Sequence, residues 1–332
     1  MIKVKVSTLT PRWKIIRQTP GSKGIWGDCE FLVDRDDVQD ADWWVVYAGM
    51  AKEEMARCPK ENTIFITGEP ESIRPYDEKF LSQFAIVITS QRSIRHPGAI
   101  YAQQGLPWFT NFHSHAYDEM KAVKRFHKEK LMSVIASKKN SREGQQKRLD
   151  LIASLKAHFG DQLDVFGGGT ANPVHDKWDG VSPYKYHLAI ENGSFDDYWS
   201  EKLADSYLGS AYPFYYGCPN LESYFPAEAF TRIDVNDHAK TIEIIEHAIA
   251  NEYYEKRQAA MAEARNLVLE KYNLFAMLAE RCAAPAADAV RQEIRLTPEK
   301  RRVDAKVELL QKLGPVYKAL RKMYRKYTGK KS

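Results

Sequence analysis

"YKYHLAIENGSFDDYWSEKLADSYLGSAYPFYYG", residues 184–217, contains a predicted strand, a polar loop, a helix and a second strand in one continuous run. The apolar and aromatic residues at 184–190 and 211–216 have the length of buried strands. The segment near 197–209 has the spacing of a helix. A strand, a helix and a strand in this order predict a parallel α/β unit, with the polar loop after its first strand.

Similar alternation extends through the first hundred residues. Short apolar runs at 2–7, 43–49, 63–68 and 85–90 predict strands, separated by polar or helical pieces of which 51–58 is one. No glycine fingerprint of the dinucleotide type follows these strands, so we do not expect a tightly held NAD there.

A second series surrounds the quoted stretch. Strands are predicted at 131–137 and 163–166, with a helix near 145–159 between them. The polar stretch 111–129 separates the two series, and we place a domain boundary near it. The expected fold class is therefore α/β, with two domains of similar size and largely parallel sheets.

An acid, an amide, a phenol and a lysine gather where the first quoted strand ends. Helical spacing places four polar side chains on one face of a helix beginning near residue 197, namely Tyr198, Glu201, Lys202 and Asp205. Asn192 lies in the preceding loop, beyond the carboxyl end of a strand, where α/β sheets bind ligands. A helix N-terminus and a lysine favour phosphate, and a carboxylate accepts hydrogen bonds from ribose hydroxyls. The set predicts a nucleoside diphosphate site, and a solvated amphipathic helix is the alternative.

The composition is that of a globular protein, with 332 residues, 44% hydrophobic and 12% aromatic. The four cysteines have no paired spacing, which argues against a disulfide framework or a zinc site. The sequence starts without the apolar segment of a secretory signal, and no apolar run reaches about 18 residues. We therefore expect a soluble, cytoplasmic protein.

The net charge of +5 is concentrated near the C-terminus. Residues 316–332 hold seven basic residues and no acid, which leaves 42 basic against 44 acidic residues elsewhere. This distribution argues against a protein-wide nucleic-acid surface. Because apolar residues recur at helical spacing among the basic ones, we expect a helix on an anionic membrane surface. The alternatives are a helix packed on its own domain and a disordered basic end.

The quoted stretch resembles the signature of glycosyltransferase family 10, the α-1,3/4-fucosyltransferases, in their bacterial form. The family pattern runs roughly Y-K-F-x-L-x-F-E-N-[ST], then Y-x-T-E-K, a small-residue helix and P-[IV]-x-x-G, and the spacing from Asn192 to Lys202 fits it. Residues 224–235, YFPAEAFTRIDV, resemble another family segment. The resemblance covers roughly residues 60–280, and Ser200 replaces the usual threonine.

The resemblance implies the GT-B fold, in which two Rossmann-like α/β domains place the active site in the cleft between them. On this basis we expect an acceptor-binding domain over 1–125, a nucleotide-sugar-binding domain over 126–290 and a basic amphipathic tail over 291–332.

Family roles in donor binding carry over to five residues of this sequence, which are Arg148, Asn192, Tyr198, Glu201 and Lys202. Arg148 matches the arginine that contacts the donor diphosphate, and Arg142 in the preceding loop is the alternative. Lys202 is expected at the diphosphate and Glu201 at the ribose hydroxyls.

The same resemblance implies a catalytic base on the N-terminal side. Glu69, in the segment TGEPE, matches the proposed family base that deprotonates the acceptor hydroxyl. Glu71 is close enough in sequence to compete for that role.

The activity implied is inverting transfer of L-fucose from GDP-fucose to a glycan, as an α-1,3-fucosyltransferase. The expected acceptor is the 3-hydroxyl of N-acetylglucosamine or glucose in a surface polysaccharide or lipopolysaccharide precursor. We expect no essential divalent metal or other cofactor, no nucleic-acid partner, and residence in the cytoplasm, with the tail on the inner face of the membrane. The open alternatives are another nucleotide-sugar donor and a non-catalytic glycan- or lipid-binding relative.

Two further groups have metal-ligand residue types without a convincing spacing. Asp34 and Asp36 form a D-x-D in the polar run DRDD, and His113 and His115 lie two apart in FHSHAYDE. Hard cations need several convergent oxygens, and the histidines lie in a predicted linker. We therefore expect no metal site.

Overall fold

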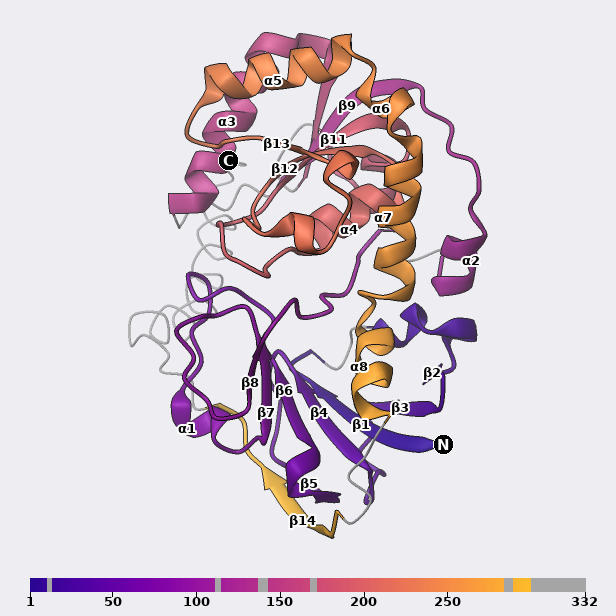
Figure 1. Cartoon of the computed structure of the whole chain (residues 1–332), viewed down its shortest axis with the longest axis vertical. Helices are drawn as coiled ribbons and strands as arrows, with labels where there is room; N and C mark the ends of the chain where they lie inside the picture. Colours follow the sequence, from indigo (N-terminus) through magenta and orange to yellow (C-terminus); the bar gives the residue numbers. More distant parts are fainter. Residues whose placement is uncertain (11–13, 111–114, 137–142, 168–171, 284–288, 300–332) are drawn as a thin grey trace, which may run out of the picture. The chain divides into compact units, whose positions relative to one another are not determined.

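A seven-stranded sheet and a five-stranded sheet organise the chain (Figure 1). The computed structural model describes residues 1–10, 14–110, 115–136, 143–167, 172–283 and 289–299. Met1–Pro298 forms one compact unit. The predicted membrane-binding segment 316–332 lies outside the described residues. Within the described residues, no helix combines the length and the apolar character needed to cross a bilayer.

The seven-stranded sheet has the order β2-β3-β1-β4-β6-β7-β8 and is parallel except for the β2–β3 pair. Its strands are β1 (Ile2–Thr8), β2 (Ile25–Trp26), β3 (Cys29–Val33), β4 (Trp43–Tyr47), β6 (Thr63–Ile66), β7 (Ile86–Thr89) and β8 (Ala99–Tyr101). The four upstream strand predictions are confirmed as β1, β4, β6 and β7. β4 and β6 are buried along their whole length because apolar clusters cover both faces of the sheet.

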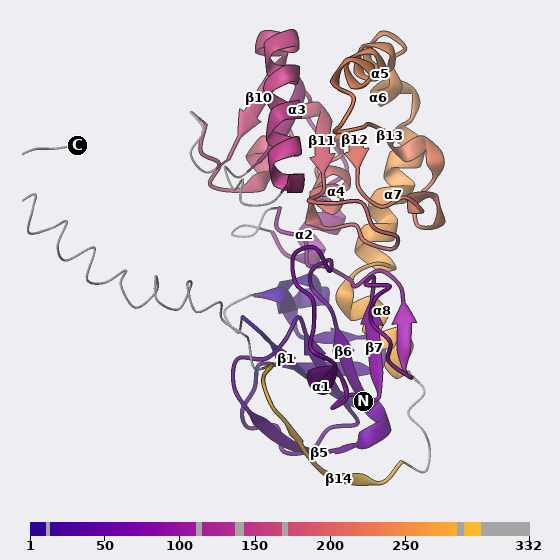
Figure 2. The ribbon, with the colours of Figure 1, turned by 90° about the vertical axis from the view of Figure 1, so that its left-hand side faces the viewer.

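The predicted polar or helical piece at 51–58 contains a strand instead, and that prediction is wrong. β5 (Glu54–Pro59) pairs antiparallel with β14 (Arg291–Leu296), which lies beside it in Figure 2. The first residues of the expected C-terminal tail are therefore a strand. Ile294 and Leu296 alternate with charged residues and pack into the apolar cluster around Phe65, so this pairing buries apolar surface.

The five-stranded sheet is parallel throughout, with the order β10-β9-β11-β12-β13. Its strands are β9 (Lys130–Ile135), β10 (Leu163–Phe166), β11 (Tyr184–Ile190), β12 (Tyr212–Tyr216) and β13 (Thr231–Arg232). The strands predicted in and around the quoted stretch are confirmed, and β10 and β11 have the predicted bounds.

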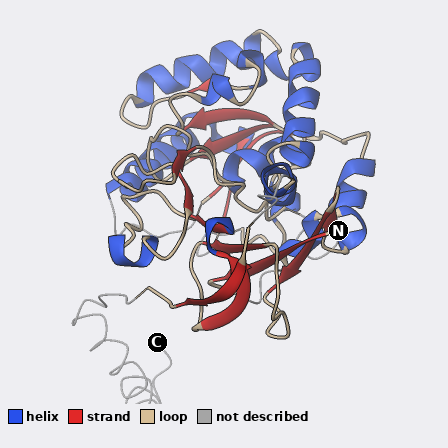
Figure 3. Ribbon diagram, turned by 60° about the horizontal axis from the view of Figure 1, so that its bottom comes forward, coloured by secondary structure: helices blue, strands red, loops and turns tan. Residues whose placement is uncertain are grey.

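Helices cover both faces of this sheet, as the blue helices around the red strands in Figure 3 show. The α-helices in the described residues are α1 (Glu78–Leu81), α2 (Tyr117–Ala122), α3 (Glu143–Phe159), α4 (Glu201–Leu208), α5 (His238–Ala250), α6 (Tyr253–Lys256), α7 (Gln258–Glu270) and α8 (Leu274–Cys282). α3 and α5 share one apolar cluster with the sheet, and α4 and α7 share another.

The α3 helix confirms the predicted helix near 145–159, with one change to its buried face. Ile152, Leu155 and Phe159 are buried as expected. Leu149 is half-buried, and Gln145, Arg148 and Leu151 take the remaining inward positions. The buried face of α3 therefore includes a charged side chain at the end nearer the β11 loop.

The α8 helix returns the chain to the N-terminal sheet. Leu274, Phe275 and Leu278 pack in the same apolar cluster as Val4 and Phe31, on strands β1 and β3. The expected division at residues 125 and 290 stays a prediction, although α8 and β14 both contact the N-terminal half.

Candidate active site

The N-terminus of α4 lies beside the end of β11, at the carboxyl edge of the five-stranded sheet. Ser200 is the N-cap and accepts a hydrogen bond from the Lys202 backbone at 3.3 Å. The helix therefore begins at Glu201 and not near residue 197, so the prediction that Tyr198 shares a helix face with Lys202 is wrong. Glu201 and Lys202 are in the first turn, as predicted.

Glu191 explains this start, because it holds the N-cap in place. Its side chain is fully buried, and Oε1 accepts hydrogen bonds from both the backbone N and the Oγ of Ser200 at 2.8 Å. Gly217 gives it space, since a Cβ there would lie 2.6 Å from the Glu191 Cγ. The position of Glu191 at the strand end was visible in the sequence, but its contact with Ser200 was not.

Lys202 is buried among acids. Its Nζ lies 3.2 Å from Glu191 Oε2 and 3.3 Å from Glu201 Oε1. Burial acts to lower the pKa of Lys202, but Glu191 and Glu201 raise it above its ordinary value. Lys202 therefore stays charged at neutral pH.

Glu201 is ionised for the same reason. Burial acts to raise its pKa, but Lys202 and Lys177 lower it to about 2. Lys177, in a short 3-10 helix at Lys177–Gly180, lies 3.5 Å from the same Oε1 that Lys202 contacts. Two lysines thus contact Oε1 of Glu201. Its other carboxylate oxygen, Oε2, remains an acceptor for a hydroxyl group.

Arg148 reaches the same edge from the first turns of α3. Its Nη1 donates a hydrogen bond to Asn192 Oδ1 at 2.8 Å. Its Nε is buried without a hydrogen-bond partner among the described residues. Burial lowers the pKa of Arg148, opposed by Glu191 and Glu201. A buried guanidinium with an unused donor is suited to an anionic ligand.

Close packing of α3 against the β11 loop sets the position of Arg148. A Cβ at Gly144, in the first turn of α3, would lie 2.2 Å from the backbone oxygen of Asn192. Only a glycine allows this approach. The arginine alternative, Arg142, lies outside the described residues.

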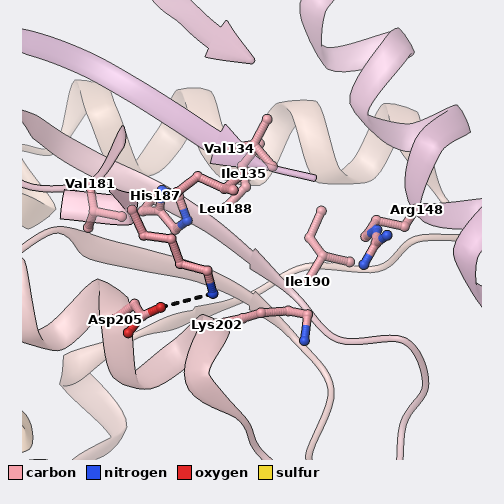
Figure 4. A pocket seen from close by; sticks show the side chains of 10 residues that line it. Val134, Ile135, Arg148, Val181, His187, Leu188, Ile190, Lys202 and Asp205 are labelled. Carbon is pink, nitrogen blue, oxygen red and sulfur yellow. Dashed lines mark hydrogen bonds and ion pairs between the residues drawn. The ribbon is translucent and has the colours of Figure 1, made fainter. Parts of the chain in front are cut away.

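A small pocket brings these side chains together (Figure 4). Arg148 and Lys202 line it with Lys177, and Asp205 is the acid among the lining residues. Lys177 Nζ lies 3.0 Å from Asp205 Oδ2. The lining thus holds three cationic side chains and one acid, while Glu191 and Glu201 pair with Lys202 beside it. Cations gathered in this way suit an anion such as a diphosphate.

Asp205 has a different role from the one expected from its helical spacing. Its Oδ1 accepts hydrogen bonds from the backbone N–H groups of Phe109 and Thr110, both at 3.0 Å. Asp205 thus anchors the segment that leaves the N-terminal sheet, while Lys177 neutralises it. Neither Lys177 nor this anchoring was predicted, because both depend on contacts between distant segments.

Tyr198 lies in the loop before α4 and is almost fully buried. Burial raises its pKa well above the ordinary value, and Glu191, Glu69 and Glu201 raise it further. Its phenol therefore stays protonated and keeps its hydrogen to donate.

Glu69 follows β6 and lies within electrostatic reach of this cluster. Glu69 is exposed, but partial desolvation of its carboxyl group raises its pKa, with Lys202 lowering it and Glu201 and Glu191 raising it. A carboxylate with a raised pKa near a cationic pocket has the character of a general base. By contrast, Glu71 accepts a hydrogen bond from Ser93 Oγ at 2.5 Å. The two glutamates that compete in sequence thus differ in their surroundings.

The acids of DRDD do not converge on one point. Asp34 accepts hydrogen bonds from the backbone N and Oγ1 of Thr8 at 2.8 Å, whereas Asp36 pairs with Lys52 at 2.6 Å. His113 lies outside the described residues, and the ring of His115 stacks on Trp178. Within the part of the chain that is described, no group of three or more metal-ligand side chains converges.

The fold and the site define an α/β protein of the GT-B class, with Rossmann-like sheets and a cationic pocket at the carboxyl edge of the second sheet. Residues 126–259 match the family model for glycosyltransferase family 10 (fucosyltransferase), C-terminal part. This match confirms the resemblance seen in the sequence, over the part of the chain that the family model covers.

Individual relatives agree with this assignment. A putative fucosyltransferase-like protein of Arabidopsis thaliana is 28% identical over 194 residues, which cover 56% of this chain and 34% of the relative. The α-(1,3)-fucosyltransferase FucT of Helicobacter pylori is 30% identical over 104 residues, which cover 29% of this chain and 21% of the relative. The matches thus span about a third or less of each relative.

Solved structures show the same fold. A crystal structure of an α1,3-fucosyltransferase superposes with a TM-score of 0.50 and 16% identity, over 78% of this chain and 80% of that one. At this identity the likeness bears on the fold alone.

Proposed function

We propose that the protein is an inverting glycosyltransferase that moves L-fucose from GDP-fucose to a hydroxyl group of a glycan. The proposal is supported by the match of residues 126–259 to the family 10 model and by the convergence of Arg148, Lys177 and Lys202 on one pocket. The convergence is the observation that carries it, because a departing nucleoside diphosphate needs fixed positive charge.

In the donor site, each candidate residue has one task. Arg148 and Lys202 neutralise the diphosphate, and the unused Nε of Arg148 donates to a phosphate oxygen. The positive end of the α4 helix dipole adds to this attraction. Glu201 accepts hydrogen bonds from the ribose hydroxyls through its second oxygen. Asn192 holds the Arg148 guanidinium, and Tyr198 completes the pocket as a hydrogen-bond donor.

The transfer itself is one displacement with inversion. Glu69 takes the proton of the acceptor hydroxyl as that oxygen forms its bond to C1 of fucose. The bond from C1 to the β-phosphate oxygen breaks at the same time, and GDP leaves with its charge balanced by Arg148 and Lys202. Because these residues supply the positive charge, the step needs no divalent metal.

For the acceptor, we propose the 3-hydroxyl of N-acetylglucosamine or glucose in a surface glycan, such as a lipopolysaccharide precursor. Such precursors are assembled at the inner face of the cytoplasmic membrane, and the basic segment 316–332 would bring the enzyme there. Removing 316–332 should release the protein from vesicles containing anionic lipid while leaving turnover of a soluble acceptor unchanged.

The test is a panel of nucleotide sugars, assayed for donor hydrolysis and for transfer to glycan acceptors. We expect GDP-fucose to be used and GDP to bind more tightly than UDP in calorimetry. Lys202→Met should abolish the turnover of GDP-fucose and the binding of GDP. Lys185→Met should preserve both, because Lys185 pairs with Glu255 on the exposed surface. Tighter UDP binding would indicate another donor, and binding without turnover would indicate a non-catalytic relative.

A further inference from the structure

Gln91 holds the main chain that carries the proposed base. It lies just beyond β7, and its side chain is almost fully buried. Its Nε2 donates hydrogen bonds to the backbone oxygens of Glu69 and Arg74, both at 2.8 Å. Its own backbone N donates to Thr89 Oγ1 at 2.9 Å. The amide therefore ties both ends of the Glu69–Arg74 loop to the end of β7.

Strained and closely packed backbone supports the same loop from the other side. Arg74 Nη1 donates to the backbone oxygen of Ala48 at 2.6 Å, and Ala48 has a left-handed φ of 58°. A Cβ at Gly68 would lie 2.6 Å from the Ala48 Cβ. Non-glycine residues adopt such a φ at a cost that the surrounding structure must offset, and they cluster at functional sites.

We infer that Gln91 is a positioning residue, which fixes the loop so that the Glu69 carboxylate faces the donor pocket. The inference rests on the proposed function of Glu69. A glutamine is suited to this task because its amide group provides two hydrogens for two carbonyl oxygens at once. Without these two N–H groups, the backbone oxygens of Glu69 and Arg74 each lose a hydrogen bond, and the loop shifts toward solvent.

The loop geometry matters because proton transfer depends on hydrogen-bond reach between base and hydroxyl. A displacement of about 1 Å at a reacting group costs roughly 100-fold in rate. None of these hydrogen bonds joins Gln91 to a residue that lines the donor pocket, so donor affinity should not depend on it.

The experiment compares Gln91→Met, which keeps the length and loses both donors, with wild type and with Glu69→Gln. We expect kcat to fall about 10- to 100-fold while the KM for the donor stays within about twofold. Adding Gln91→Met to Glu69→Gln should cause little further loss, because a residue that acts through Glu69 has no effect once the base is gone.

Gln83→Met is the matched control. The Gln83 amide likewise donates to two backbone oxygens, those of Phe80 and Thr297, at 3.1 Å, but it lies in the connection between α1 and β7. It should lose thermal stability without losing kcat. If Gln91→Met does not fold, Gln91→Asn, which keeps the amide on a shorter side chain, should show a smaller loss of the same kind.

Two results would separate the failure of this inference from that of the function. An active wild type with an unchanged kcat in Gln91→Met, or with fully additive effects of the two substitutions, would overturn the positioning role. Absence of transfer by the wild type with every nucleotide sugar would instead overturn the proposed function.

Discussion

Arg148 and Asn192, 44 residues apart in sequence, meet through a 2.8 Å hydrogen bond from Nη1 to Oδ1. The bond joins the start of α3 to the loop after β11, and it aims the guanidinium across the end of the sheet. Arg148 is thus fixed before any ligand arrives, which reduces the entropy lost on binding.

Arg148→Lys should weaken GDP binding at least about tenfold, because a lysine has the charge but not the planar fork of donors. Isothermal titration would measure the change. Arg265→Lys is the control, since Arg265 is half-buried but donates to the backbone oxygen of Leu208, at the far end of α4. Equal losses in the two variants would contradict a role in anion binding.

Glu191→Gln should lower the free energy of unfolding by about 3 kcal/mol, because it leaves the buried Lys202 without its nearest anion. Urea denaturation would measure this. Glu143→Gln removes an exposed partner of Lys147 and should cost less than about 0.5 kcal/mol. A similarly small effect of Glu191→Gln would show that Glu201 and solvent are sufficient to stabilise the positive charge of Lys202.

Acid should destabilise the protein through His187. Burial, together with Lys177 and Lys128, lowers the pKa of His187 from 6.5 to about 3. Between these values the unfolded chain binds a proton that the folded chain does not, so the free energy of unfolding falls by up to about 1.4 kcal/mol per pH unit on acidification.

His187→Gln should remove this contribution, and unfolding midpoints measured at several pH values would show it. The variant should start less stable near neutral pH, because Ser133 loses its 2.8 Å hydrogen bond to the His187 ring. Its stability should then change less with pH than that of the wild type. Parallel pH profiles would rule His187 out as the titrating group.

The pH dependence of transfer should report Glu69. Because partial desolvation and the nearby Glu201 and Glu191 raise the pKa of this carboxyl above its ordinary value, kcat/KM should fall on acidification at a higher pH than an unperturbed glutamate would cause. Glu69→Gln should remove the acid limb and lower kcat by about 100-fold or more. Glu71→Gln should leave the acid limb and kcat nearly unchanged. If Glu71→Gln has the large effect and Glu69→Gln the small one, the base is Glu71.

Transfer should continue after exhaustive treatment with a chelator. Arg148, Lys177 and Lys202 supply the positive charge around the donor diphosphate in our proposal. Turnover measured with and without EDTA, and after adding back Mg²⁺ or Mn²⁺, is the test. Loss of activity that a metal restores would show that the lysines and arginine do not suffice.

Strong local patterns predicted the second sheet well. The apolar runs that form β10 and β11 have the predicted bounds, since buried parallel strands need continuous apolar residues. The start of α4 was misplaced because Ser200 becomes the N-cap through its contact with Glu191, nine residues away and on the other side of a loop. The strand β5 was missed because its partner, β14, lies more than two hundred residues further along the chain.

The sequence alone determined the α/β class and the resemblance to family 10, and it predicted residues that could bind a nucleoside diphosphate, because periodicity and motif spacing are local properties. Only the tertiary structure decided how those residues are arranged. It paired Lys202 with Glu191, brought Arg148 to Asn192, added Lys177 and gave Glu69 and Glu71 different surroundings. These contacts depend on packing between distant segments, which no local pattern specifies.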